Sequence, residues 1–209
     1  MIKNYIWDFD GMLFDTYHHT TAAFCETYRR MGTELDKNEV FSNLKISLLH
    51  AYRVYETDEK TIDAFFEIEN DLTFEPVAFA YEKIPEALKL IWENGGKNFL
   101  YTHRDKVAVE YLDKHNLSQY FEGFVTRENG FPLKPAPDAI EYICAEYALK
   151  KDETMMLGDR LIDIGSGKNA GVHTCLFDEF NSFSENEAEW YFNSTADIYD
   201  RIREEIKKQ

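Results

Sequence analysis

The sequence is short of positive charge and contains no long apolar run. Of its 209 residues, 23 are Lys or Arg and 39 are Asp or Glu, which gives a formal net charge of −16. Such a protein repels nucleic-acid backbones and anionic membrane surfaces, so we expect neither as a partner. No stretch approaches the ~18 apolar residues of a membrane span, and no apolar signal segment follows Met1. We expect a cytoplasmic protein whose partner is a small molecule.

Cysteines are few and are not arranged in pairs. Cys25, Cys144 and Cys175 are odd in number, and none lies in a Cys-x-x-Cys pattern. A disulfide framework and a zinc cluster are therefore not indicated, which suits a reducing compartment. Internal repeats and low-complexity tracts are also absent. With 44% hydrophobic and 15% aromatic residues, the chain can fill one substantial core and a smaller accessory unit.

Short apolar strands alternate with helical segments over most of the chain. The first strand spans Tyr5 to Phe9 and is interrupted only by an acid. After Pro85, helical segments each lead to a strand: residues 86–96 to 97–102, 106–116 to 124–126, 137–149 to 154–159, and 161–171 to 173–177. This alternation predicts an α/β fold with a doubly wound parallel sheet. A loop region is expected over 178–195 and a closing amphipathic helix over 197–207.

A helical segment is inserted directly after the first strand. Between Asp15 and about Ala78, apolar residues recur at helical spacing and no strand pattern interrupts them. The expected helices span residues 20–32, 38–55 and 59–74. We therefore expect a core domain over 1–14 and 82–209, and an all-helical cap domain over 15–81 that lies above the strand ends.

Polar groups follow three of the expected strands. Asp8 and Asp10 close the first strand, Thr102 closes the second, and Asp159 follows "TMMLG". In a parallel sheet these strand ends meet at one edge, where ligands bind. Two acids so close together repel each other and favour a divalent cation. Mg²⁺ takes carboxylates together with phosphate oxygens and water, so the pattern indicates a magnesium site.

Two further groups fit the same site. Lys134 in "PLKPAP" offers a point positive charge for a phosphoryl oxygen, and Asp163 lies one helical turn after Asp159. Each signal also has an ordinary structural interpretation, since Asp is common at strand ends and helix N-caps, Thr is common in strands, and Lys is common in solvated loops. The order of the segments and their positions at successive strand ends favour the functional interpretation.

Four segments, "DFDGMLFDT", "LYTHR", "LKPAPD" and "LGDRLIDIGSGKNAG", resemble in this order the four motifs of the haloacid dehalogenase-like (HAD) hydrolases. The resemblance covers nearly the whole chain. It lies with the branch of phosphoglycolate phosphatases and beta-phosphoglucomutases, which have a Rossmann-like core and a helical cap after the first motif. It implies that Asp8 is the nucleophile, that Asp10 is the general acid and base, and that Thr102 and Lys134 bind phosphate.

The resemblance also implies the metal ligands and the activity. The Mg²⁺ ligands would be Asp8, the backbone carbonyl of Asp10, and Asp159, with Asp163 in support. We expect a phosphoric monoester hydrolase that dephosphorylates a small metabolite, such as phosphoglycolate or a sugar phosphate, through an aspartyl-phosphate. The expected assembly is a monomer or homodimer.

Three neighbours of these residues are further candidates for substrate contact. They are Gly11, His103 and Arg104. Arg104 follows Thr102 closely enough to reach a second anionic group on a substrate, such as a carboxylate.

Several alternatives stay open on sequence alone. Met12 replaces the usual Thr after "DFDG" without removing any of the four catalytic roles, and Asp10 argues against a dehalogenase. A phosphohexomutase shares all four motifs, but a cap histidine and a Gly-Val-Ser-Arg stretch are not clear in this sequence. A receiver-type signalling domain is disfavoured by the inserted segment of roughly 60 residues. A silent interaction protein of the same fold is the third alternative.

Overall fold

The computed structural model describes residues 1–183 and 186–208. Contacts within the chain divide it into two units. Met1–Leu13 and Ala80–Gln209 form the core unit, and Phe14–Phe79 forms the helical unit. The boundaries predicted from sequence differ from these by one or two residues, and the placement of the cap above the strand ends stays a prediction.

The core unit is built around a sheet that has six strands in the described residues. In spatial order they are β5 (Phe121–Val125), β4 (Lys97–Tyr101), β1 (Asn4–Trp7), β6 (Thr154–Gly158), β7 (His173–Phe177) and β8 (Trp190–Phe192). Every neighbouring pair runs parallel. The chain winds outward from β1 in both directions, which is the doubly wound arrangement. The predicted fold class is therefore confirmed.

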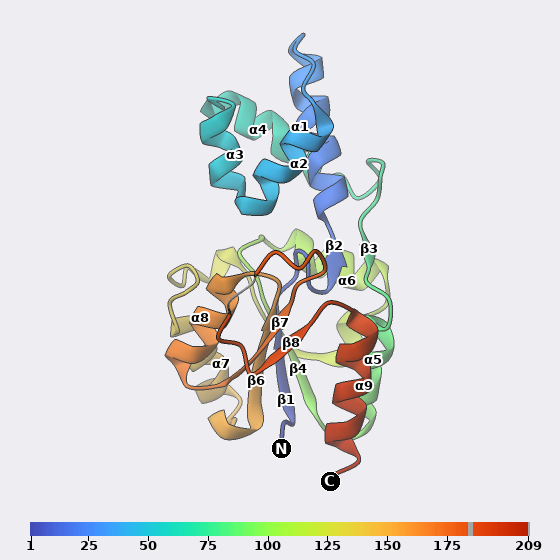
Figure 1. The fold of residues 1–209 in the computed structure, drawn as a ribbon, viewed down its shortest axis with the longest axis vertical. Coiled ribbons are helices and arrows are strands. Elements are labelled where there is room, and N and C mark those ends of the chain that lie inside the picture. The colour runs from blue at the N-terminus through green and yellow to red at the C-terminus, as the bar shows by residue number, and fades with distance from the viewer. Residues whose placement is uncertain (184–185, 209) are drawn as a thin grey trace. The chain divides into compact units, whose positions relative to one another are not determined.

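Helices cover both faces of this sheet. They are α5 (Ile84–Glu93), α6 (Val107–Lys114), α7 (Asp138–Glu146), α8 (Leu161–Ala170) and α9 (Thr195–Ile206). Figure 1 shows α7 and α8 on one side of the strands and α5 and α9 on the other. The core unit also contains short 3-10 helices, namely η1 (Ser118–Tyr120), η2 (Arg127–Asn129) and η3 (Lys151–Glu153). Because both faces are covered, the central strands are continuous apolar runs rather than alternating ones.

The core packs in rows across the sheet. Phe99, Ile6 and Met156 are register partners on β4, β1 and β6, and none of them is exposed. Ile140 and Ile143 of α7 belong to the same cluster. Burying a side chain of this kind stabilises the fold by about 1.5–3 kcal/mol. The strands that carry the polar groups are thus held in a rigid layer.

The helical unit has a core of its own. It contains α1 (Tyr17–Arg30), α2 (Lys37–Ile46), α3 (Leu48–Val54) and α4 (Glu59–Glu69). Phe24, Val40, Leu44 and Phe65 are buried together between these helices. At its ends, β2 (Phe14–Asp15) and β3 (Phe79–Ala80) form a two-stranded sheet. Across residues 1–183 and 186–208, no helix is both long and apolar enough to cross a membrane.

Two expectations about elements were wrong. The single helix predicted over 38–55 is broken at Ser47, whose backbone is extended and whose Oγ accepts a hydrogen bond from the His50 N–H at 2.9 Å. A serine that caps a new helix thus overrides a continuous apolar pattern. The loop predicted over 178–195 contains β8, which pairs with β7; residues 184 and 185 lie outside the described part. Tertiary pairing decides such a short edge strand.

Candidate active site

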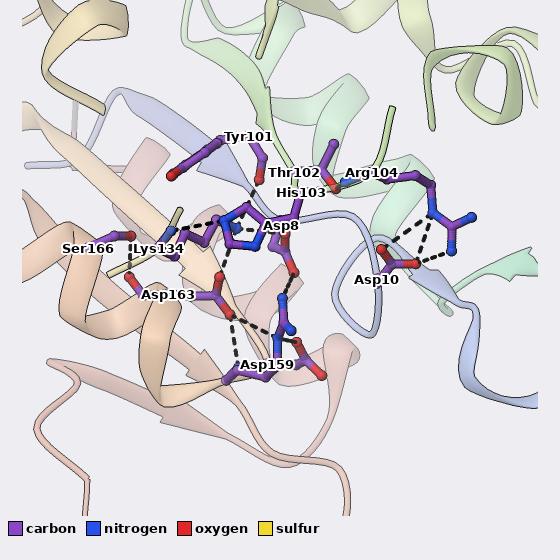
Figure 2. Close-up of polar contacts among 11 residues, drawn as sticks. Asp8, Asp10, Tyr101, Thr102, His103, Arg104, Lys134, Asp159, Asp163 and Ser166 are labelled. Carbon is purple, nitrogen blue, oxygen red and sulfur yellow. Dashed lines mark hydrogen bonds and ion pairs between the residues drawn. The ribbon is translucent and has the colours of Figure 1, made fainter. Parts of the chain in front are cut away.

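Parallel pairing brings three polar strand ends to one edge of the core unit. Asp8 follows β1, Thr102 follows β4 and Asp159 follows β6, and these are neighbouring strands. Each ladder continues past the strand end, because the Asp8 N–H donates to Leu157 O at 2.9 Å and the Thr102 N–H to Val125 O at 3.0 Å. Backbone bonds therefore set the positions of the side chains at this edge. Figure 2 shows several of these side chains, among them Asp8, Thr102 and Asp159.

The ammonium group of Lys134 joins two carboxylates inside the protein. Its Nζ lies 2.7 Å from Asp8 Oδ1 and 2.7 Å from Asp163 Oδ1, and it donates to Tyr101 O at 3.0 Å. The side chain has no exposed surface. Burial works to lower the pKa of Lys134, but Asp163 and Asp8 outweigh it and raise the pKa. Lys134 is therefore a fixed buried cation that donates hydrogen bonds to Asp8 Oδ1 and Tyr101 O and forms an ion pair with Asp163.

The two carboxylates on Lys134 differ in their proton affinity. Burial raises the pKa of Asp8 to about 7, although Lys134 opposes the rise. Burial acts on Asp163 too, but Lys134 and Arg160 outweigh it and lower its pKa. Asp163 Oδ2 also accepts the Arg160 N–H at 3.0 Å, at the start of α8. Asp163 is thus the permanent anion of the pair, and Asp8 is the carboxylate that can take up a proton.

Asp8, Asp159 and Asp163 form a cluster that we call the carboxylate trio. Each is buried, and one oxygen from each lies within 4.8 Å of the others. Asp8 Oδ2 accepts no hydrogen bond from the residues that the structure describes. Hard oxygen donors grouped in this way match the ligand preference of Mg²⁺. The trio therefore fits the metal predicted from sequence. The carboxylate of Asp10, predicted to bind through its backbone carbonyl, lies outside this group.

Arg160 was not among the residues singled out from sequence. Its guanidinium faces the whole trio: Nη2 lies 3.9 Å from Asp8 Oδ2, and Nε lies 3.7 Å from Asp159 Oδ1 and 4.0 Å from Asp163 Oδ2. The available signal was its position in "GDRLID", next to one selected acid and three residues before another. A cation there lowers the electrostatic cost of three neighbouring anions.

Asp10 lies two residues beyond Asp8, in contact with Arg104. Gly11 follows with a φ of +75°, a left-handed conformation that suits glycine and turns the chain sharply after Asp10. Arg104 Nη2 donates to Asp10 Oδ1 at 2.7 Å. Thr102 Oγ1 accepts the Arg104 N–H at 3.0 Å, which fixes the start of the loop that follows β4. Figure 2 shows the Asp10–Arg104 pair to one side of the groups around Lys134.

His103 forms a hydrogen bond with the backbone of Lys134. Its Nε2 accepts the backbone N–H of Lys134 at 2.9 Å, so this nitrogen carries no proton. Burial, together with the charges of Lys134 and Arg160, lowers the pKa of His103 to about 4. The ring is therefore neutral at pH 7 and positions the segment that carries Lys134. Its predicted contact with substrate stays a prediction, as do those of Gly11 and Arg104.

Gly158, the last residue of β6, was also missed from sequence. A Cβ at this position would overlap the side chain of Asp163. The absence of a side chain lets α8 approach β6 closely enough for Asp163 to reach Lys134. The sequence signal was a glycine directly before Asp159.

This fold and site define a class of hydrolase in which a buried aspartate at the end of the first core strand is flanked by a lysine and two further acids. The sequence matches the haloacid dehalogenase-like hydrolase family over residues 5–177, and the chain belongs to that family.

Individual relatives agree with this assignment. A hydrolase structure from Streptococcus pneumoniae is 32% identical, covers 85% of this chain and 93% of its own, and has a TM-score of 0.65. The pyrophosphatase PpaX of Halalkalibacterium halodurans is 25% identical over 84% of this chain and 83% of its own length. A putative phosphatase from Clostridium difficile shares the fold, with a TM-score of 0.80, 20% identity and coverage of 96% and 98%. The predicted family and the predicted enzyme class, a phosphoric monoester hydrolase, are confirmed.

Proposed function

We propose that the chain is a Mg²⁺-dependent phosphatase that hydrolyses a small phosphomonoester, of the phosphoglycolate or sugar phosphate kind, through an aspartyl-phosphate on Asp8. The observation that carries this proposal is the environment of Asp8. Its side chain is 1% exposed, Lys134 Nζ lies 2.7 Å from Oδ1, and Oδ2 accepts no hydrogen bond from the described residues. A carboxylate held in this way keeps a lone pair available for attack on phosphorus.

The two acids of "DFDG" have environments suited to different roles. Asp8 is buried, whereas the side chain of Asp10 is 30% exposed and can exchange protons with water. In the first step Asp8 attacks phosphorus, the ester P–O bond breaks, and Asp10 gives its proton to the leaving oxygen. In the second step a water attacks the acyl phosphate and Asp10 takes the proton of that water. The bond between phosphorus and the Asp8 oxygen breaks, which regenerates the Asp8 carboxylate and releases inorganic phosphate.

Positive charge at the site supports an anionic substrate despite the net charge of −16. Lys134 lies beside Asp8 and lowers the repulsion between this carboxylate and the oxygens of a phosphoryl group. When bound by the carboxylate trio, Mg²⁺ would supply further positive charge to the phosphoryl oxygens. The remaining negative surface disfavours nucleic acids and anionic membranes, so we propose a small phosphorylated metabolite as the partner and a cytoplasmic location.

A phosphate-release assay tests this function. The panel contains phosphoglycolate, several sugar phosphates, and pyrophosphate because relatives carry the name pyrophosphatase. We expect release with Mg²⁺ and loss of release with chelator or in Asp8→Asn. The exposed Asp113→Asn on α6 is the matched control and should keep wild-type activity. No release from any compound, or full activity in Asp8→Asn, would contradict the proposal.

The intermediate can be examined separately from turnover. Acid quenching of a single turnover, followed by peptide mass analysis, should show phosphate on the peptide that contains Asp8. The same samples should be assayed for isomerised sugar phosphate. Isomerisation without phosphate release would replace the hydrolase with a mutase.

A further inference from the structure

The guanidinium of Arg160 contacts the same three side chains that fit a metal ion. It lies 3.7–4.0 Å from one oxygen of each member of the carboxylate trio. These distances exceed the 2.7–3.2 Å typical of hydrogen bonds, so the contacts with the three acids are ion pairs. Its position is that of a shared counter-ion.

The second cation at the site is held quite differently. Lys134 has no exposed side-chain surface and makes two ion pairs at 2.7 Å and a hydrogen bond to a backbone carbonyl. The side chain of Arg160 is 27% exposed, whereas those of the trio are at most 7% exposed. Lys134 is thus a permanent part of the site, while the Arg160 guanidinium has a route to solvent.

The backbone of Arg160 is anchored independently of its side chain. Its N–H donates to Asp163 Oδ2 at 3.0 Å, in the first turn of α8. The start of this helix is therefore held by a backbone hydrogen bond that does not involve the guanidinium. A long, flexible side chain on a fixed backbone can exchange one position for another by rotamer changes alone.

The Arg160 guanidinium and Mg²⁺ would compete for oxygens of the same three acids. A guanidinium within 4 Å of the same oxygens would repel Mg²⁺ strongly in a buried, weakly screened environment. We propose that Arg160 is the resident counter-cation of the carboxylate trio in the metal-free protein and that Mg²⁺ binding displaces its guanidinium. This inference rests on the metal site of the proposed function. It adds that Arg160 tunes metal affinity, because the metal must compete with a charge that the chain itself supplies.

Calorimetric titration with Mg²⁺ tests the competition without any assay of activity. Arg160→Gln removes the charge, Arg160→Lys keeps it, and Arg203→Gln removes the charge of an exposed arginine that pairs with Asp200 on α9. We expect Arg160→Gln to bind Mg²⁺ about tenfold more tightly than wild type. Arg160→Lys and Arg203→Gln should stay within about threefold of wild type.

Thermal melts in chelator provide the second measurement. Arg160→Gln should melt a few degrees lower than wild type without metal, because the trio loses its counter-ion, and should gain more from added Mg²⁺. Arg203→Gln should follow wild type in both conditions. Equal or weaker Mg²⁺ binding in Arg160→Gln would overturn the inference.

Displacement itself can be observed by NMR. The Arg160 Nε–Hε resonance, assigned by its loss in Arg160→Gln, should shift on addition of Mg²⁺. A resonance that does not respond at saturating Mg²⁺ would overturn the inference, as would failure of both wild type and Arg160→Gln to bind the metal. If wild type binds Mg²⁺ and the resonance shifts, but no phosphate ester is hydrolysed, the proposed function fails and displacement stands.

Discussion

The guanidinium of Arg104 contacts both carboxylate oxygens of Asp10: Nη2 lies 2.7 Å from Oδ1, and Nε lies 3.4 Å from Oδ2. The arginine side chain is 11% exposed, and its Cζ lies 5.7 Å from the centre of the Phe9 ring. Its backbone N–H is bound to Thr102 Oγ1. Arg104 therefore links the end of β4 to the acid after β1, and its geometry suits a residue that orients Asp10.

Replacing Arg104 separates this role from substrate binding. In Arg104→Gln we expect kcat to fall about 10- to 100-fold while KM changes less than about threefold, because Asp10 loses the group that orients its carboxylate. Arg104→Lys should restore part of kcat. Steady-state kinetics on the best substrate of the panel measures both constants. A large rise in KM at constant kcat would instead indicate that Arg104 contacts the substrate, as expected from sequence.

Asp8→Asn should change the pH dependence of stability. The pKa of Asp8 is raised from 3.8 to about 7, so between these values the folded protein keeps a proton that the unfolded chain has lost. The wild type therefore loses stability as the pH rises through this window, whereas Asn does not titrate. We expect the free energy of unfolding of Asp8→Asn, relative to that of wild type, to rise by on the order of 3 kcal/mol between pH 5 and pH 8. Urea unfolding in chelator measures this difference, and parallel pH profiles for the two proteins would contradict it.

His103 should contribute stability that disappears in acid. Its pKa is lowered from 6.5 to about 4, so the unfolded chain takes up a proton before the folded protein does. Stability is then complete above pH 6.5 and is lost as the pH falls towards 4. The amide oxygen of Gln can also accept the Lys134 N–H, but Gln does not titrate. Between pH 6.5 and 4, the free energy of unfolding should therefore fall by on the order of 2 kcal/mol less in His103→Gln than in wild type. Urea unfolding at a series of pH values measures this, and a His103→Gln profile parallel to that of wild type would contradict it.

Gly158→Ala should damage the metal site as well as the fold. The added methyl group would overlap the side chain of Asp163, which must move away from Lys134. We expect a lower urea midpoint and Mg²⁺ binding at least about tenfold weaker, measured by calorimetry. Gly123→Ala on β5 is the matched control, because its methyl group would meet Tyr147. This control should lose stability and keep its Mg²⁺ affinity; equal affinities in both variants would contradict the role of Gly158.

The edge of the sheet that carries the site could be predicted from sequence. The alternation of helices and apolar strands identified the parallel sheet, and parallel strands place their carboxyl ends together. That rule predicts the shared edge for Asp8, Thr102 and Asp159, because each of them directly follows an apolar run. The charge argument from Asp8 and Asp10 predicted a cation beside these acids, but the structure pairs Asp10 with Arg104 and groups Asp8 with Asp159 and Asp163, so the metal stays a prediction.

The detailed contacts could not be predicted in the same way. Arg160 and Gly158 lie beside selected acids, but their roles depend on how closely α8 approaches β6. His103 meets the Lys134 backbone across 31 positions of sequence, and Arg104 meets Asp10 across 94. Such contacts arise from the packing of distant elements, on which local periodicity carries no information.

By itself, the sequence determined the sheet, the inserted helices and which acids stand at the strand ends, because residue periodicity and turn chemistry act over short distances. Tertiary structure alone decided the β8 pairing, the sharing of Lys134 between Asp8 and Asp163, and the position of Arg160 over the carboxylate trio. The physical reason is that burial and electrostatic interaction depend on distances between side chains, and these are set when the strands and helices pack.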